Sequence, residues 1–514
     1  MKMAGQEVVD QELIVATRRG DQAEVARLLA AGAAVDARDN DGQTALMRSA
    51  EDGRTETVAA LLKGGAEANA RDDDGYTALM RAAEDGHTAI VTALLAAGAV
   101  VDTRDNYGST ALLRAAANGH PDTIVTLLDA GAEVDACNKM GWTALIRAAR
   151  HGRTTIVAAL IAAGAVVDAR DNDGKTALMW AAEDGCTDTV AALLAAGAAV
   201  DASNKKEGKT ALMVTAQYGH TAAVTALLAA GAAVDARDNE GYTALLLAAR
   251  YGRAETVTAL IAAGADVNAR DSNGYTALMW SAEDGCTDTV AALLAAGAEG
   301  NAHDNDGKTA LMVAARYGRT DTVAALLAVG AEGNAHDNDG KTALIWAAAN
   351  GRTAAVTALL AAGAEGNARD KMGWTALMDA SGNGHTTVVT TLLAAGVEVD
   401  GCDDGWTALM CATTNGHTDT VAALIDGGAE VNVRSDDNDR TPLLIAAADG
   451  YHTTVAALIA AGADVDAIGK DGKSAIDLAT DEPTRAVLLA AVSAVSAAVE
   501  AAPKAPSQTR GMQP

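Results

Sequence analysis

Apolar and polar positions follow one pattern that recurs along almost the whole chain. Each copy contains the tripeptide Thr-Ala-Leu or a close variant, which begins at Thr44, Thr77, Thr110, Thr143, Thr176, Thr210, Thr243, Thr276, Thr309, Thr342, Thr375, Thr407, Thr441 and Ser474. Successive copies are 33 residues apart, except for three intervals of 34, 32 and 34 residues. These exceptions all lie in the Asp-, Asn- and Gly-rich stretch before the Thr, so this stretch is predicted to be a loop. A degenerate copy over residues 11–20 precedes the series and brings the number of units to 15.

Each unit is predicted to form a helix, a turn, a second helix and a projecting hairpin. In residues 176–201 the segment TALMWAAEDG reads as a short helix that begins at Thr176 and ends at Gly185. The next segment, TDTVAALLAAGA, repeats apolar residues at helical spacing and stops at Gly197. The polar stretch that follows carries turn residues and a Gly suited to positive φ. Helices of about three turns are marginal alone, so each must be stabilised by its neighbours.

The repeated units resemble ankyrin repeats over roughly residues 10–492. The matching text is clearest in DDDGYTALMRAAEDGHTAIVTALLAAGAVVDTR, residues 72–104. The chain departs from the family pattern in keeping its Pro only at Pro442 and in replacing the His of the first helix by Met, Leu, Ile or Asp. The resemblance implies an all-α ankyrin-repeat solenoid, a curved elongated rod of helix-turn-helix units with β-hairpin fingers.

The same resemblance implies a division of the chain into four parts. Residues 1–42 are expected to form an N-terminal capping repeat, and residues 43–473 the repeat array. A C-terminal capping repeat with an extended helix is expected over residues 474–500, followed by a flexible tail over residues 501–514.

Composition and charge narrow the possible partners. The net charge of −29 opposes attraction to nucleic acid phosphates and to anionic lipid, so we expect neither a nucleic acid nor a membrane as partner. No segment has the apolar length of a signal peptide core or of a membrane span, which predicts a cytoplasmic protein. The five cysteines are odd in number and form no Cys-x-x-Cys pair, so they predict neither a disulfide framework nor a zinc site.

Candidate catalytic and metal-binding motifs are incomplete. Gly-Lys-Thr or Gly-Lys-Ser occurs five times, but a phosphate-binding loop also needs a Gly five residues earlier, and none of the five has it. The acidic fingers resemble part of a calcium loop that is nowhere complete. Five histidines follow the Gly between the helices, where the family uses His structurally, and His303 and His336 are about one layer apart. We therefore predict no enzyme activity, no cofactor and no metal site.

Function is expected where the units differ, because the framework residues barely change. The position just before the Thr includes the aromatic residues Tyr76, Trp142, Tyr242, Tyr275, Trp374 and Trp406. The fourth residue after the Thr is successively Arg48, Arg81, Arg114 and Arg147, and later includes Trp180, Trp280 and Trp346. Binding surfaces favour aromatic residues and Arg. The resemblance implies that both positions face the concave groove with which ankyrin proteins usually hold partner proteins.

The four arginines divide into two predicted environments. Arg48 and Arg81 each have acidic residues one turn further along the same helix, with which they are expected to pair. Arg114 and Arg147 have no such acids, which predicts a local basic patch that contacts a partner. The alternative is that every Arg is paired and that each Trp merely packs between layers.

Two further segments depart from the repeat pattern. Gly300, Gly333 and Gly366 replace the usual Val at the entry to the hairpin, which predicts a softer region of the array over residues 299–367. Near the C-terminus an apolar stripe continues past the length of an ordinary second helix, through Leu488, Val492, Val495 and Val499. This stripe is a candidate for self-association, or else it folds back on the array or frays.

The sequence therefore predicts a non-enzymatic scaffold that binds partner proteins in its groove without a cofactor. A second hypothesis is a structural protein that assembles with copies of itself as a homo-oligomer or filament. A third is an ankyrin array that is delivered into a host cell as an effector.

Overall fold

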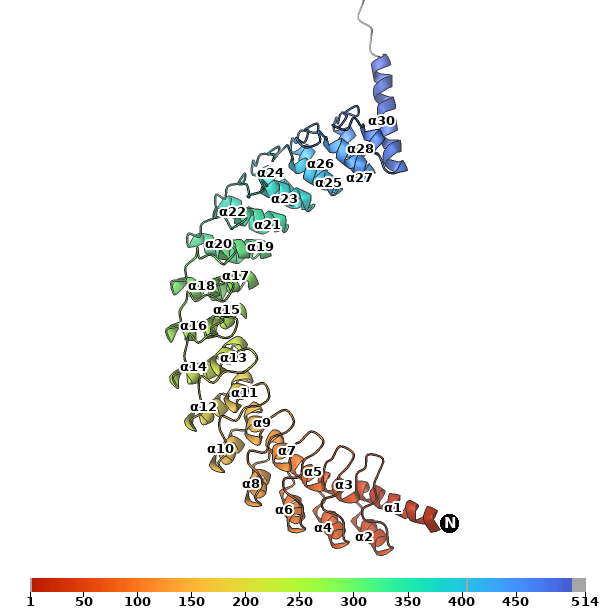
Figure 1. The fold of residues 1–514 in the computed structure, drawn as a ribbon, viewed down its shortest axis with the longest axis vertical. Coiled ribbons are helices and arrows are strands. Elements are labelled where there is room, and N and C mark those ends of the chain that lie inside the picture. Colours follow the sequence, from red (N-terminus) through yellow and green to blue (C-terminus); the bar gives the residue numbers. More distant parts are fainter. Residues whose placement is uncertain (1, 404, 502–514) are drawn as a thin grey trace, which may run out of the picture. The chain divides into compact units, whose positions relative to one another are not determined.

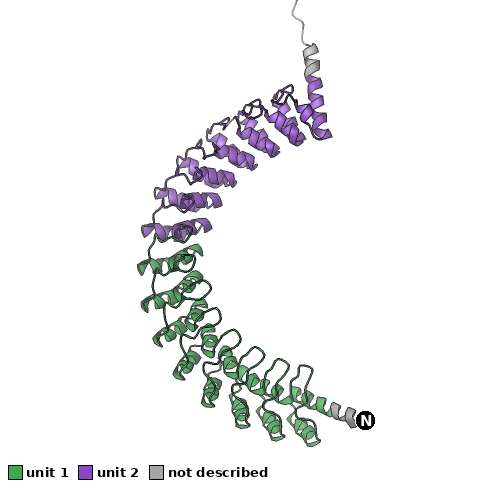
Figure 2. Cartoon of the chain, viewed as in Figure 1, with its two compact units in different colours: residues 1–272 green, residues 273–514 purple. Residues whose placement is uncertain are grey.

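The computed structural model describes the backbone of residues 2–403 and 405–501 and the side chains of residues 9–403 and 405–494. The chain forms two compact units, Met1–Ser272 and Asn273–Pro514, which Figure 2 shows in different colours. Within each unit, pairs of antiparallel helices stack one after another (Figure 1). The described residues form 30 helices, which confirms the 15 predicted helix pairs.

The helices of the first unit are α1 (Lys2–Arg19), α2 (Gln22–Ala30), α3 (Ala45–Glu51), α4 (Thr55–Lys63), α5 (Ala78–Glu84), α6 (Thr88–Ala96), α7 (Ala111–Asn118), α8 (Pro121–Asp129), α9 (Ala144–Arg150), α10 (Thr154–Ala162), α11 (Ala177–Glu183), α12 (Thr187–Ala195), α13 (Ala211–Tyr218), α14 (Thr221–Ala229), α15 (Ala244–Arg250) and α16 (Ala254–Ala262).

The helices of the second unit are α17 (Ala277–Asp284), α18 (Thr287–Ala295), α19 (Ala310–Tyr317), α20 (Thr320–Ala328), α21 (Ala343–Ala349), α22 (Thr353–Ala361), α23 (Ala376–Gly382), α24 (Thr386–Ala394), α25 (Ala408–Thr414), α26 (Thr418–Asp426), α27 (Pro442–Asp449), α28 (His452–Ala460), α29 (Ala475–Leu478) and α30 (Glu482–Ala501). Among them, none combines the length and apolarity that crossing a bilayer requires, and the same holds for the described helices of the first unit.

Helix boundaries lie where the capping residues predict them. The Thr176 hydroxyl accepts a hydrogen bond from the Met179 N–H at 3.4 Å, which caps the start of α11. Gly185 and Gly197 follow α11 and α12 with φ of 68° and 85°. This left-handed conformation costs Gly little and ends the helices at these points.

The core consists of small and branched side chains shared between neighbouring repeats. On α11 the alanines and Leu178 are buried, and on α12 Val190 and Leu193 are fully buried. The alanines allow α11 to lie close to α9 and α13, with which it makes its main contacts between repeats. Because each helix buries its apolar face against the next repeat, stability is shared along each unit.

The predicted hairpins are reduced to loops that are closed by single bridges. Isolated antiparallel bridges such as Arg38↔Thr44 occur in the described residues, and no extended strand is present there. In the first finger the Asp39 carboxylate accepts hydrogen bonds from the N–H groups of Asp41 and Gln43, at 3.0 and 2.9 Å. These N–H groups are bonded to the carboxylate, so they do not extend a β-ladder.

Side chains at one position of several repeats form hydrogen bonds with the preceding repeat. Five histidines donate from Nε2 to a carbonyl of the preceding repeat at 2.8 to 3.2 Å, as in His120 to Glu84 O, and they are His87, His120, His220, His385 and His417. Their predicted structural role is confirmed. His303 and His336 each bond to a carbonyl of their own finger at 2.8 Å. The described residues contain no group of three or more His, Cys, Asp or Glu placed to hold a metal ion.

The C-terminal helix packs on the last repeat through part of its apolar stripe. Leu488 is fully buried, so at this position the stripe folds back on the array, as the second alternative predicts, and Leu488 is unavailable to a second copy of the chain. The reason is that α30 packs against α28 and α29. Val492 is half-buried, whereas Val495 and Val499 lie outside the residues whose side chains are described. The predicted flexible tail also lies outside the described residues from position 502 onward.

The three glycines at hairpin entries have different surroundings. A Cβ added at Gly300 would meet no atom within 4 Å, and a groove of about 490 Å³ lies beside it, lined by Leu294 and Val329 among others. A Cβ at Gly366, in contrast, would lie 2.7 Å from Val397. At Gly366 the larger Val397 of the next repeat therefore occupies the space that a Val side chain would fill. Easier opening of residues 299–367 stays a prediction.

Two substitutions to the residue found in most repeats should have opposite effects. Gly300→Val should raise the free energy of unfolding by about 0.5–1.5 kcal/mol, because it restricts the unfolded chain and covers apolar surface in the groove. Gly366→Val should lower it by about 1–3 kcal/mol, because the side chain collides with Val397. Urea unfolding of the full chain, followed by circular dichroism, measures both. Effects of equal sign would contradict this account.

Candidate functional site

Three variable positions of each repeat lie together on one surface. They are the residue before the Thr that caps the first helix and the fourth and seventh residues after that Thr; we call this surface the variable row. The Tyr76 ring shows the arrangement, since Arg81 of its own repeat and Arg114 of the next lie over it at 4.1 and 4.4 Å. These two adjacent repeats thus share one surface.

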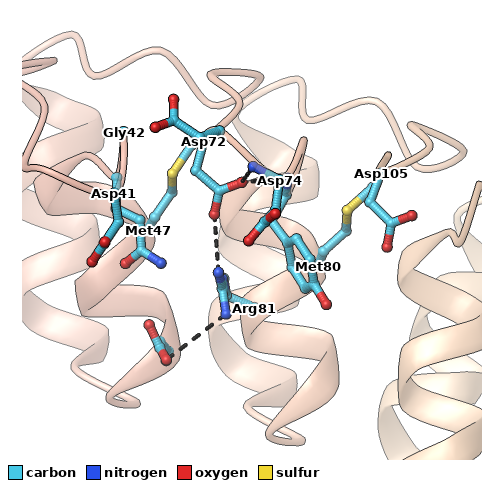
Figure 3. Close-up of polar contacts among 12 residues, drawn as sticks. Asp41, Gly42, Met47, Asp72, Asp74, Met80, Arg81 and Asp105 are labelled. Carbon is cyan, nitrogen blue, oxygen red and sulfur yellow. Dashed lines mark hydrogen bonds and ion pairs between the residues drawn. The ribbon is translucent and has the colours of Figure 1, made fainter. Parts of the chain in front are cut away.

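A buried aspartate in several fingers positions residues of the variable row. One oxygen of Asp72 accepts hydrogen bonds from the N–H groups of Asp74 and Tyr76, at 3.1 and 2.7 Å. The other oxygen accepts from Arg81 Nη2 at 2.9 Å, as Figure 3 shows. The same carboxylate therefore shapes the finger and orients the Arg nine residues later.

The charged form of such an aspartate is stabilised in the first finger of the array. Burial alone would raise the pKa of Asp39, but hydrogen bonds from two backbone N–H groups and from Arg48 outweigh it and lower that pKa. The Arg48 guanidinium lies 3.1 Å from Asp39 and 3.6 Å from Glu51, so its predicted pairing on its own helix is confirmed.

Pairing of the next two arginines differs from the prediction. Arg81 pairs with Asp72 and, at 3.9 Å, with Glu51 of the preceding repeat, instead of with acids on its own helix. Arg114 is 2.6 Å from Asp105 and 3.4 Å from Glu84, so the prediction that it is unpaired is wrong. Spacing along one helix could not reveal these partners, because they lie in the finger and on the preceding repeat.

Arg147 is the exception among the four arginines. No carboxylate in the described part of the chain lies within ion-pair distance of it, and its guanidinium lies 5.0 Å from the Trp142 ring. Burial, and then the charges of Arg114 and Arg150, lower the pKa of Arg147. At Arg114 the effect of burial is outweighed by the Asp105 hydrogen bond and nearby negative charges, which raise its pKa. Arg114 therefore does not belong to the predicted basic patch, which consists of Arg147 and its neighbour Arg150.

Tryptophans further along the row use the same finger aspartates. Trp180 Nε1 donates to Asp171 at 2.9 Å, and Trp346 Nε1 donates to Asp337 at the same distance. Both indoles are half-buried, so one face is packed while part of the ring stays accessible. The finger aspartate therefore accepts either a guanidinium or an indole N–H from the variable row.

The remaining predicted aromatic residues occupy several environments. Tyr275 lies 4.9 Å from the half-buried Trp280, ring centroid to ring centroid. Tyr242 is only 6% exposed and accepts a hydrogen bond from Arg250 at 2.9 Å, so it offers little surface to a partner. Trp374 and Trp406 line a pocket of about 420 Å³.

Several residues of the variable row were not singled out from the sequence. Lys175 lies over the Trp180 ring at 4.0 Å, and Lys341 is 3.2 Å from Asp379, whose pKa is raised by burial. The apolar residues at the second variable position belong to the core instead, since Val214, Leu247, Val313, Cys411 and Ile445 are all buried. An aspartate that recurs nine residues before a variable position is the sequence signal that could have located the row.

A comparison with models of protein families identifies the repeat. A family model described as "Ankyrin repeats (3 copies)" matches residues 13–105, 52–137, 112–204, 193–271, 265–337, 329–403 and 396–469. No curated protein sequence matches the chain. Among solved structures, the crystal structure of the human ASB11 ankyrin repeat domain is similar at 28% identity and a TM-score of 0.39, over 42% of this chain and 98% of that domain.

The different pairing of two arginines can be tested by neutralising each one. Arg114→Gln should lower the free energy of unfolding by about 1–3 kcal/mol, because it leaves the buried Asp105 carboxylate without its cation. Arg147→Gln should change it by about 0.5 kcal/mol or less, since only a contact with the Trp142 ring is lost. Denaturant titrations of both variants provide the comparison, and equal destabilisation would refute the distinction.

Proposed function

Because this chain belongs to the ankyrin-repeat family, whose repeats are generally protein–protein interaction modules, we propose that it is a non-enzymatic cytoplasmic scaffold. It binds partner proteins along the variable row, between the fingers and the first helices. No cofactor takes part in this function.

One observation carries the proposal: half-buried aromatic and Arg side chains line the variable row in positions that neighbouring residues hold in place. Trp180 and Trp346 are each bonded to a finger aspartate, and Arg81 is bonded to Asp72. Trp, Tyr and Arg contribute most to protein–protein affinity. Side chains that are already ordered lose less entropy on binding, so the row is suited to a partner surface.

Removing indoles from the row should weaken binding. Trp180→Ala with Trp346→Ala should reduce the retention of partner proteins about tenfold or more, because each indole contributes a large contact area. The measurement is retention of proteins from a cell lysate on immobilised wild-type and variant chains, well below their melting temperatures.

A control variant shows whether the loss of any exposed apolar side chain weakens binding, or only the loss of one in the variable row. Val329→Ala removes another exposed apolar side chain, which is 59% exposed at the end of α20 and outside the row. It should leave retention unchanged. Partners that bind the double variant as well as the wild type would show that the row is not the binding surface.

Self-assembly is a second candidate function, and α30 favours it. This helix has 20 residues, whereas α28 has nine, and Leu489 on it is 50% exposed. An exposed apolar side chain on such an extension is suited to contact with a second copy of the chain.

Removing the end of α30 tests this second candidate. Deleting residues 494–514 leaves the buried Leu488 in place and should lower the mass measured by light scattering across a concentration series, if copies associate through this helix. Circular dichroism should show that the array remains folded. An unchanged mass would exclude self-assembly through the deleted segment.

A further inference from the structure

Arg147 lacks both acidic residues that pair with the equivalent Arg in earlier repeats. Arg114 has Asp105 in its finger and Glu84 on the preceding repeat, at 2.6 and 3.4 Å. The equivalent residues for Arg147 are Asn138 and Ala117, which carry no charge. The absence of an ion pair at Arg147 therefore follows from two coordinated differences in the sequence.

Asn138 makes the same hydrogen bonds to the finger backbone as the aspartate of other repeats. Its Oδ1 accepts hydrogen bonds from the N–H groups of Met140 and Trp142, both at 3.0 Å, as Asp105 does with Tyr107 and Ser109. The finger thus keeps its shape. The remaining group of Asn138 is an NH₂ donor, which offers no acceptor to a guanidinium.

The surroundings of Arg147 contain cations, aromatic rings and the buried Asp171, whose carboxylate accepts hydrogen bonds from the Trp142 and Trp180 indoles at 3.2 and 2.9 Å. Arg150 lies over both the Trp142 and Trp180 rings, at 5.2 and 4.6 Å, and its nearest carboxylate, Asp184, is 4.0 Å away. The two indoles meet edge to face at 5.6 Å. Burial, and then the charges of Arg147, Arg150 and Arg153, lower the pKa of the neighbouring His151. The region thus combines the unneutralised charge of Arg147 with half-buried aromatic rings.

We propose that Arg147 and Arg150, together with the Trp142 and Trp180 rings, bind the carboxylate of an Asp or Glu side chain flanked by apolar residues in a partner protein. This inference rests on the proposed scaffold function and identifies the partner chemistry of one segment of the variable row. We call these four residues the carboxylate site.

A carboxylate fits because three earlier repeats already bind one at the equivalent Arg. Asp39, Asp72 and Asp105 supply it at 3.1, 2.9 and 2.6 Å. At the carboxylate site a partner supplies the missing anion, and the rings accommodate its apolar neighbours. The net charge of −29 repels a highly acidic partner at long range, so one or two carboxylates among apolar residues suit the site better than a polyanion.

The test uses the full chain and synthetic peptides in calorimetry at physiological salt. The main probe is a peptide with blocked ends that carries two adjacent glutamates between leucines. The same peptide with glutamines and a third with phosphoserines are the comparisons. The wild-type chain should bind the glutamate peptide at least about tenfold more tightly than the glutamine peptide, because charge-assisted contacts to Arg are lost in the latter.

Two kinds of variant should abolish this preference. Arg147→Met removes the cation, and Asn138→Asp with Ala117→Glu restores the internal carboxylates of the earlier repeats. Both should weaken binding of the glutamate peptide about tenfold, although the second keeps Arg147. Lys63→Gln and Gln22→Glu make single charge changes at exposed positions on second helices and should have no effect.

The converse change tests what an unpaired Arg contributes without the rings. Asp105→Asn with Glu84→Ala leaves Arg114 without its two carboxylates, but Ser109 and Ala117 stand where the carboxylate site has Trp142 and Arg150. The glutamate peptide should therefore bind this variant more weakly at Arg114 than at the carboxylate site, and equal binding at both places would show that the rings and Arg150 contribute nothing. Circular dichroism must show that this variant is folded.

The outcomes separate this inference from the scaffold proposal. No preference for the glutamate peptide, or equal binding by wild type and Arg147→Met, would overturn the carboxylate site. Tighter binding of the phosphoserine peptide that also depends on Arg147 would replace the carboxylate by a phosphate and overturn it as well. If partner retention still depends on Trp180 and Trp346, the scaffold function survives either failure.

Discussion

The buried carboxylate of the finger aspartate is the interaction on which the rest of the surface depends. A buried carboxylate is costly unless its oxygens are hydrogen-bonded. In Asp72 one oxygen is satisfied by two backbone N–H groups and the other by Arg81. The first set of bonds gives the finger its shape, and the second restricts the variable side chain to one orientation.

Different side chains donate to the second oxygen of the finger aspartate in different repeats. Arg114 does so for Asp105, and the Trp180 indole N–H does so for Asp171. Arg and Trp can therefore occupy the same position of the variable row without a change in the backbone of the finger. The first unit combines arginines with aromatic rings along its row, and in the second unit Lys341 and Trp346 lie side by side. A partner would meet different chemistry in successive repeats on an unchanged backbone.

The backbone of each repeat is stabilised by the neighbouring repeats, because each helix is too short to be stable alone. Histidines such as His120 bond to the preceding repeat, and small alanines let the first helices approach closely. Where one repeat loses volume, the next can supply it, as Val397 does beside Gly366. At Gly300 no neighbouring side chain compensates, and a groove remains. The same substitution thus has different consequences in two repeats.

The sequence by itself determined the repeat and the helix boundaries, because these depend on local features, and the family resemblance indicated the structural histidines. A capping Thr176, a Gly185 at positive φ and apolar residues at helical spacing act within a few residues of one another. The tertiary structure alone decided which charged groups are neutralised. Arg114 finds its carboxylates in a finger nine residues earlier and on the preceding repeat, whereas the carboxamide of Asn138 leaves Arg147 without one. Stacking likewise decided between the two alternatives for Leu488, which is buried where α30 packs on α28 and α29. Such outcomes depend on side chains from different repeats meeting in space, and the spacing of residues along one helix carries no information about that.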